Sequence, residues 1–164
     1  MKIDKAFREL VVAGLVDDTP YRVFGAQATG CSPVAAAFRA GRDVVHPVRP
    51  ATIAKSLAIG NPADGPYVLD VVRRTGGAVA DVSDAEVVDS MQLLARAQGV
   101  FGETAGGVTV GVLRKLLAAG QLDPDAETVI INSGDGLKTL SAVASAVTVP
   151  HAIKPTLEAF QAQY

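Results

Sequence analysis

The stretch AVADVSDAEVVDSMQLLARAQ, residues 78–98, predicts a buried strand that leads directly into a helix. Its first five residues are mostly small or β-branched, which is typical of a strand inside a sheet. Ser83 and Glu86 then form a capping-box pattern, in which each side chain satisfies the other residue's backbone amide at a helix start. Apolar residues recur on one helical face over residues 87–95, and Gly99 ends the pattern. A strand joined to a helix in this way indicates an α/β domain.

Helical patterns and short apolar runs alternate on both sides of this stretch, with no internal repeat. Ser32 is a suitable cap for one of these helices, and Pro33 suits its first position. Thr128 to Ile131 is strongly apolar and is expected to be buried in a parallel sheet. We therefore expect a single α/β domain over residues 1–164. The other expected elements are helices from Ile3 to Gly14, Ser32 to Gly41 and Pro66 to Arg74, a short helix from Thr52, and a strand from Tyr21 to Ala28. A glycine-rich segment from Gly102 to Gly107 is expected to lead into a further helix that ends at Gly120.

The composition narrows the class of protein. The chain has 164 residues and a net charge of −2, with both signs spread along its length, so neither a nucleic-acid partner nor a membrane surface is indicated. One cysteine excludes an internal disulfide and fits the cytoplasm. The chain is 49% hydrophobic and only 20% charged. Either abundant alanine and valine explain this, or the domain exposes an apolar surface that a partner covers.

Chemistry-bearing residues are sparse. Two glycine-rich turns, at residues 28–31 and 132–136, follow expected strands, where ligands bind in open α/β sheets. The two histidines, His46 and His151, have no nearby ligand pattern, so a metal site is not expected. Neither the phosphate-binding P-loop nor the complete dinucleotide fingerprint occurs. Three carboxylates around the capping box are expected to serve as caps and surface groups: Asp81, Asp84 and Glu86.

Four segments, in order, are similar to the second half of the threonine synthases, which are fold-type-II pyridoxal-phosphate enzymes. The most specific is PATIA at residues 50–54 with IGNP at 59–62. FGAQA at 24–28 precedes a Gly-x-x-Pro helix start, and GVFGE at 99–103 precedes a helix of small residues. SGDGLK at 133–138 stands where the family usually has Thr-Gly-His-Gly-Leu-Lys. Together the segments extend the resemblance from Ile3 to Leu140.

The resemblance implies an incomplete version of the three-layer, parallel-sheet large domain found in the tryptophan synthase β-like fold. In that fold the hydroxyl at the Ser133 position hydrogen-bonds the cofactor's pyridine nitrogen, with Gly134 and Glu103 beside it. Thr52, Ile53 and Ala54 would line the substrate pocket. Two departures, Asp135 for the usual histidine and Thr139 for a common aspartate, leave local details open.

The resemblance also implies that something is missing. The family binds its cofactor through a lysine in a Ser/Ala-Phe-Lys-Asp/Asn context and holds the cofactor phosphate in a Gly-Asn loop, and neither pattern occurs here. We therefore expect the C-terminal portion of a threonine synthase, without a catalytic residue of its own and inactive alone. Its partner would be an N-terminal half, and without it the chain would self-associate. The intact enzyme would convert O-phospho-homoserine and water to threonine and phosphate.

Two alternatives remain open at the level of sequence. One is a stand-alone, non-catalytic binding or regulatory module that retains half of the fold. The other is part of a different fold-type-II lyase, such as a serine or threonine dehydratase or a relative of cysteine synthase.

Overall fold

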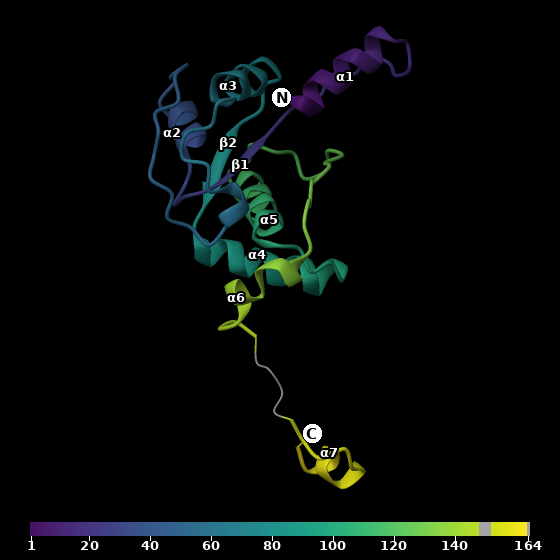
Figure 1. Ribbon diagram of the computed structural model, residues 1–164. Helices are drawn as coiled ribbons and strands as arrows, with labels where there is room; N and C mark the ends of the chain where they lie inside the picture. Colours follow the sequence, from purple (N-terminus) through teal and green to yellow (C-terminus); the bar gives the residue numbers. More distant parts are fainter. Residues whose placement is uncertain (148–151, 164) are drawn as a thin grey trace.

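A computed structural model describes residues 1–147 and 152–163, and its centre is a pair of parallel strands. β1 (Gly25–Ala28) pairs with β2 (Val79–Val82), with Gly25 opposite Val79 and Ala28 opposite Val82. Helices α2 (Pro33–Arg39) and α3 (Gly65–Arg74) lie on one face of this sheet, and α5 (Thr104–Ala118) covers the other. Helix α4 (Asp84–Gln98) packs against α5 (Figure 1). The expected α/β architecture, with helices on both faces of a parallel sheet, is confirmed in this small form.

The alternation of side chains along the strands produces two cores. Ala28 and Val82 point to one side, where they join buried residues of α4 and α5 such as Met91 and Val108. Val79 points to the other side and packs with buried residues of α2 and α3, including Leu69. Because successive strand residues face opposite sides, one short strand pair anchors both helical layers.

Local sequence signals determine where the helices begin and end. The predicted capping box is confirmed, because the Ser83 amide donates to Glu86 at 2.6 Å and the Glu86 amide donates to the Ser83 hydroxyl at 3.3 Å. Each helix from α1 (Lys2–Val12) to α5 ends beside a glycine whose φ lies between 63° and 68°, a left-handed conformation that favours glycine. These glycines are Gly14, Gly41, Gly76, Gly99 and Gly120.

Three sequence-based expectations are wrong in detail. The strand expected from Tyr21 is paired only over Gly25–Ala28, because β2 offers only four partners. The helix expected from Thr52 is a single 3₁₀ turn, η1 (Lys55–Leu57). Ser32 does occupy the position before α2, but its side chain makes no capping bond; the Gln27 side-chain oxygen accepts from the Ala35 amide at 2.9 Å instead.

The largest difference concerns residues 128–131, which were expected to form a buried strand. The segment belongs to no strand, and its side chains are exposed, with Val129 at 84% and Ile131 at 53%. Among the described residues, no backbone group pairs with the backbone of this segment. An apolar strand without neighbours cannot be buried by its own sequence, because burial requires adjacent strands and a covering layer.

Short helices complete the chain beyond this segment. η2 (Gly136–Thr139) continues into α6 (Leu140–Val143), whose Val143 is buried in the α4–α5 core. α7 (Leu157–Gln163) lies near the end of the chain. Residues 148–151 and 164 are outside the described residues, so the expectation that His151 binds no metal concerns a residue that the structure does not describe.

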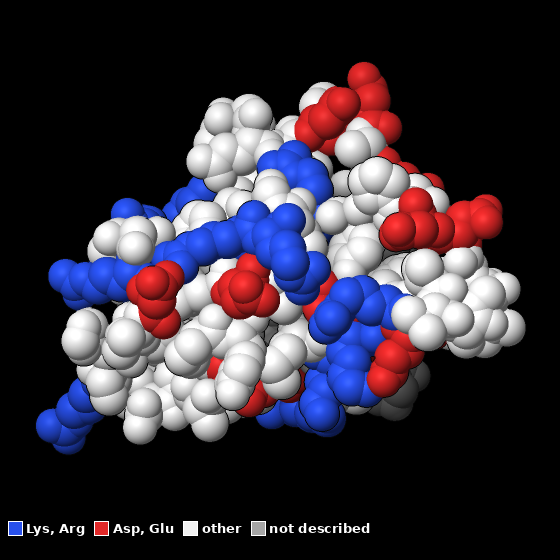
Figure 2. All heavy atoms as spheres, turned by 90° about the horizontal axis from the view of Figure 1, so that it is seen from above, with Lys and Arg blue, Asp and Glu red and all other residues white. Residues whose placement is uncertain are grey.

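The surface of the described residues has mixed charge and much apolar area. Figure 2 shows positive and negative side chains interspersed with wide uncharged areas on one face. Exposed apolar residues occur on α1 and beyond it, including Phe7, Val12 and Leu15, and again at Val129. None of the described helices is long and apolar enough to cross a membrane.

Candidate functional site

The loops that follow the carboxyl ends of β1 and β2 are joined by backbone contacts. The Ala51 amide donates to the Gly30 carbonyl at 2.8 Å, so the segment before η1 lies against the turn after β1. A Cβ at Gly30 would stand 1.8 Å from the Ala51 carbonyl oxygen, so this approach requires glycine. η1 in turn contacts α5. Parallel strands direct both of their following loops to one edge of the sheet, which is where α/β proteins bind ligands.

Asp84 connects the segment 52–54 to the end of β2. Thr52 is buried, and its hydroxyl donates to one Asp84 carboxylate oxygen at 2.5 Å. The Ile53 amide donates to the other oxygen at 3.1 Å, and the Ala54 amide donates to the Thr52 hydroxyl at 3.2 Å. The expectation that Asp84 serves as a surface cap is therefore wrong. Its long-range partner lies 32 residues away, and no local pattern could have identified it.

A second pair of segments brings Glu103 and Gly134 together at the start of α5. The Glu103 amide donates to the Gly134 carbonyl at 3.0 Å, and the Gly136 amide donates to the Phe101 carbonyl at 2.8 Å. A Cβ at Gly134 would stand 2.1 Å from a Glu103 carboxylate oxygen, so the Glu103 side chain lies directly over this glycine. Two of the predicted cofactor-site residues, which are 31 positions apart in the sequence, are thus in contact.

One buried polar side chain at the start of α5 lacks a partner, and a mostly buried carboxylate lies next to it in the sequence. Glu103 is 8% exposed, and its carboxylate is not among the fully buried groups that lack a partner. The hydroxyl of Thr104 is fully buried and has no hydrogen-bond partner among the described residues. Buried polar groups are nearly always paired, so the unpaired hydroxyl of Thr104 is a candidate ligand contact. The buried hydroxyl of Ser90, between α4 and α5, is unpaired in the same way. Sequence reasoning identified Glu103 and missed Thr104.

Asn132 is another residue that the sequence did not single out. A Cβ at Gly106 would stand 2.2 Å from its side-chain oxygen, and one at Gly102 would stand 2.7 Å from the same atom. The small residues before and within the first turn of α5 therefore make room for this amide. The sequence showed a helix of small residues here but gave no partner for them.

Ser133, the remaining predicted cofactor contact, and two lysines lie on the surface. Ser133 is exposed and lies between Asn132 and Gly134, beside the Glu103 contact. Lys55 on η1 and Lys138 on η2 are both exposed. The structure thus brings the loop of Ser133 and Gly134 to Glu103, and it holds Thr52, Ile53 and Ala54 together through Asp84.

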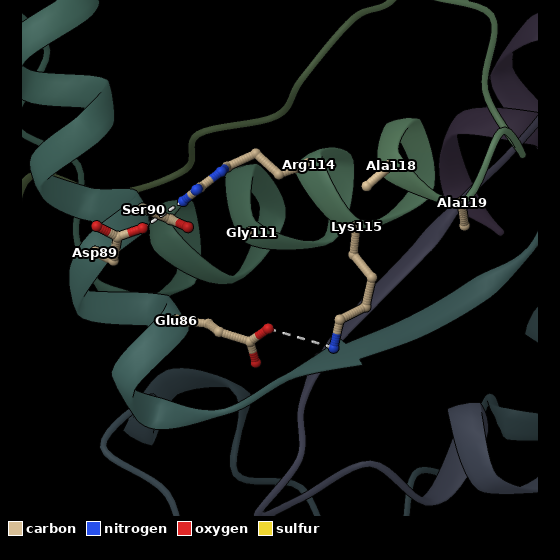
Figure 3. A pocket seen from close by; sticks show the side chains of 8 residues that line it. All are labelled: Glu86, Asp89, Ser90, Gly111, Arg114, Lys115, Ala118 and Ala119. Carbon is tan, nitrogen blue, oxygen red and sulfur yellow. Dashed lines mark hydrogen bonds and ion pairs between the residues drawn. The ribbon is translucent and has the colours of Figure 1, made fainter.

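A hollow elsewhere on the surface is a less suitable site. It lies between α4 and α5 and is lined by Glu86, Asp89, Ser90, Arg114 and Lys115 among others (Figure 3). Its charges are already paired, Arg114 with Asp89 and Lys115 with Glu86 at 3.5 Å. Cys31 is also a poor candidate, because burial raises the pKa of its thiol and disfavours the reactive thiolate.

Known proteins resemble this chain over most of its length. A family model described as "Pyridoxal-phosphate dependent enzyme" matches residues 5–134. The threonine synthase of Methanocaldococcus jannaschii is 38% identical over 147 residues, and that of Methanosarcina acetivorans is 32% identical over 160 residues. These alignments cover 89% and 97% of this chain but only 36% and 39% of the two relatives.

A solved structure shows the same fold at lower sequence identity. The threonine synthase from Escherichia coli superimposes with a TM-score of 0.58 and 17% identity, over 85% of this chain and 33% of that one.

Proposed function

We propose that this chain, which belongs to the pyridoxal-phosphate dependent enzyme family, is the part of a threonine synthase that contacts the cofactor ring. The observation that carries the proposal is the cluster at the start of α5. There the Glu103 side chain lies against Gly134 of the Ser133–Gly134 loop, and the next residue, Thr104, has a fully buried hydroxyl without a partner among the described residues.

The donor set suits the pyridine side of pyridoxal phosphate. The cofactor supplies the electron-withdrawing chemistry, and the protein supplies binding and orientation. The Ser133 hydroxyl is uncharged, so it can hydrogen-bond a ring nitrogen without forcing that nitrogen to protonate. The contact of Glu103 with Gly134 fixes the loop that carries this hydroxyl. Because Gly134 has no side chain, the Glu103 carboxylate can lie directly against the loop.

The segment 52–54 would form a wall of the substrate pocket. The Thr52 hydroxyl already donates to Asp84 and accepts from Ala54, so it serves as a scaffold. Thr52 and Ala54 are buried and Ile53 is partly exposed, so Ile53 would be the residue of this segment that faces the substrate. The proposed substrate of the complete enzyme is O-phospho-homoserine, which it would convert with water to threonine and phosphate in the cytoplasm.

The chain does not supply the covalent chemistry in this proposal. Neither Lys55 nor Lys138, both exposed, has the sequence context of the family's cofactor lysine. Without a buried amine the site lacks a nucleophile and a base at the substrate's reacting carbon. An N-terminal half, in the same polypeptide or in a separate subunit, would provide the lysine and the phosphate loop. The unpaired apolar segment 128–131 supports such a partner.

Complementation tests the proposal directly. The chain is mixed with the N-terminal portion of the Methanocaldococcus jannaschii threonine synthase, and phosphate release from O-phospho-homoserine is measured with added pyridoxal phosphate. We expect activity only when both parts are present. We expect no stoichiometric borohydride trapping of the cofactor on the isolated chain. Trapping on Lys55 or Lys138 would contradict the assignment of the cofactor lysine to a partner. If the chain stays monomeric and binds neither the cofactor nor the N-terminal portion, the result would favour a stand-alone module.

A further inference from the structure

We infer that Asp84 is a positioning residue that holds the Thr52–Ala54 wall at the carboxyl end of β2. This inference rests on the proposed function for its catalytic consequence, but the positioning itself concerns this chain alone. Asp84 is the first residue of α4, and the wall precedes η1. The two elements are far apart in sequence and are joined here by one carboxylate.

The Asp84 carboxylate uses both of its oxygens on the wall. One accepts from the Thr52 hydroxyl at 2.5 Å and the other from the Ile53 amide at 3.1 Å. Hydrogen bonds to an ionised acceptor are shorter and stronger than those between neutral groups. The Thr52 hydroxyl then accepts from the Ala54 amide at 3.2 Å, which extends the hold to a third residue. Ala54 is fully buried, so the chain of bonds ends inside the core.

Helix capping does not account for the position of this carboxylate. An acidic residue in the first turn of a helix is ordinarily explained by the helix dipole or by a capping bond. In α4, Ser83 and Glu86 already perform the reciprocal cap. Asp84 is therefore free to turn toward the wall, and it satisfies an amide and a hydroxyl that would otherwise be left without acceptors.

Amide exchange of the isolated chain tests the positioning without any activity measurement. In Asp84→Ala, which leaves no side-chain acceptor, we expect the Ile53 amide to exchange at least about tenfold faster than in the wild-type chain, measured by NMR. Asp89→Ala is the matched control, because it removes a carboxylate from the same helix that pairs with Arg114 among the described residues, and we expect less than a twofold change. An Ile53 rate within twofold of wild type in Asp84→Ala would overturn the inference.

A second variant guards against loss of folding. Thr52→Val keeps the side chain's shape but removes the hydroxyl, so only the bonds through that oxygen are broken. We expect the Ala54 amide to exchange at least about tenfold faster while Ile53 remains protected by Asp84. Unchanged exchange at Ala54 would contradict the chain of bonds.

The complemented enzyme tests the catalytic consequence. Small displacements of substrate-positioning groups cost on the order of tenfold to a hundredfold in rate. For Asp84→Ala we expect the KM for O-phospho-homoserine to rise about tenfold, with the cofactor absorbance per complex unchanged. A merely structural role would lower the amount of complex and leave KM as it is, which would overturn the positioning role. An inactive wild-type complex would instead contradict the proposed function, and the exchange experiment would still decide the positioning.

Discussion

Asp4 shows how one residue attaches the first helix to the rest of the chain. Its carboxylate is fully buried and accepts hydrogen bonds from the Tyr21 hydroxyl at 2.8 Å and from Arg74 at 3.0 and 3.1 Å. Arg8 adds an ion pair at 3.1 Å, and Phe7 stacks on Tyr21 with ring centroids 5.2 Å apart. Burial acts to raise the pKa of Asp4, but the bonds from Tyr21 and Arg74 outweigh it, so the pKa is lowered from its usual 3.8.

The lowered pKa of Asp4 predicts a pH-dependent contribution to stability. A carboxyl group with a lower pKa in the folded state stabilises the fold above its unfolded pKa, and this contribution is lost as the pH falls through the folded pKa. We expect Asp4→Asn to lower Tm at pH 7 and the gap to wild type to narrow below about pH 3.8. Thermal unfolding followed by circular dichroism between pH 7 and 2 measures this. A gap that stays constant with pH would contradict the prediction.

Ser133 supplies the residue-scale prediction for the proposed function. In the complemented enzyme we expect Ser133→Ala to reduce activity by about tenfold or more, because a hydrogen bond to the cofactor ring is lost. Assembly should be unchanged, since the exposed Ser133 side chain makes no packing contact that the alanine would remove. Ser133→Thr keeps the hydroxyl and should retain most of the activity. Kinetics and size-exclusion chromatography on the same samples separate the two effects, and equal losses of activity and assembly would count against the cofactor role.

At the scale of elements, α4 and α5 approach each other closely through small residues. A Cβ at Gly107 would stand 2.7 Å from the Val87 carbonyl oxygen, which is backbone, and 2.7 Å from the Met91 side chain. At Gly111 the nearest atom would be the Ser90 hydroxyl oxygen at 3.0 Å, followed by Val82. The two glycines therefore lie on the same face of α5, but Gly107 faces rigid backbone whereas Gly111 faces side chains.

Alanine substitutions at these two glycines should differ in their effect on stability. Alanine is favoured over glycine inside a helix by about 1 kcal/mol. At Gly107 the rigid backbone oxygen prevents relief of the clash, so we expect Gly107→Ala to destabilise the fold by roughly 1–3 kcal/mol. Gly111→Ala should lie within about 1 kcal/mol of wild type, because its contact is a side chain that can shift. Urea unfolding measures both, and equal effects would contradict the proposed difference.

Elements set by local signals could be predicted, whereas those set by distant partners could not. The capping box of α4 was predicted because Ser83 and Glu86 are three residues apart, and the resemblance pointed to Glu103 and Gly134, which are in contact. The hydrogen bond between Thr52 and Asp84 was missed, because the two residues are 32 positions apart and no local sequence pattern links them. Thr128 to Ile131 was predicted to be a buried strand from its composition, yet burial depends on neighbouring strands that these residues cannot supply.

At the scale of the whole molecule, segment 128–131 offers apolar side chains and backbone groups that pair with no other backbone among the described residues. Such groups are available to pair with a second chain, as those of an edge strand are. We expect Val129→Lys to weaken self-association of the isolated chain by about tenfold, as a charged residue does on natural edge strands. Val12→Lys, at 89% exposure against 84% for Val129, is the matched control on α1 and should have little effect. Light scattering with size-exclusion chromatography measures both. Equal effects would indicate that apolar exposure alone, and not the backbone of segment 128–131, drives association.

The glycines that close helices α1 to α5 have a consequence for synthesis on the ribosome. Each stop signal lies within two residues of the helix that it ends, so a helix can terminate correctly as soon as its own glycine has emerged. No later part of the polypeptide is needed to set these boundaries. The stop glycines of α1, α2 and α3 all precede β2, so these three boundaries are encoded in the emerged chain before β1 can pair with β2.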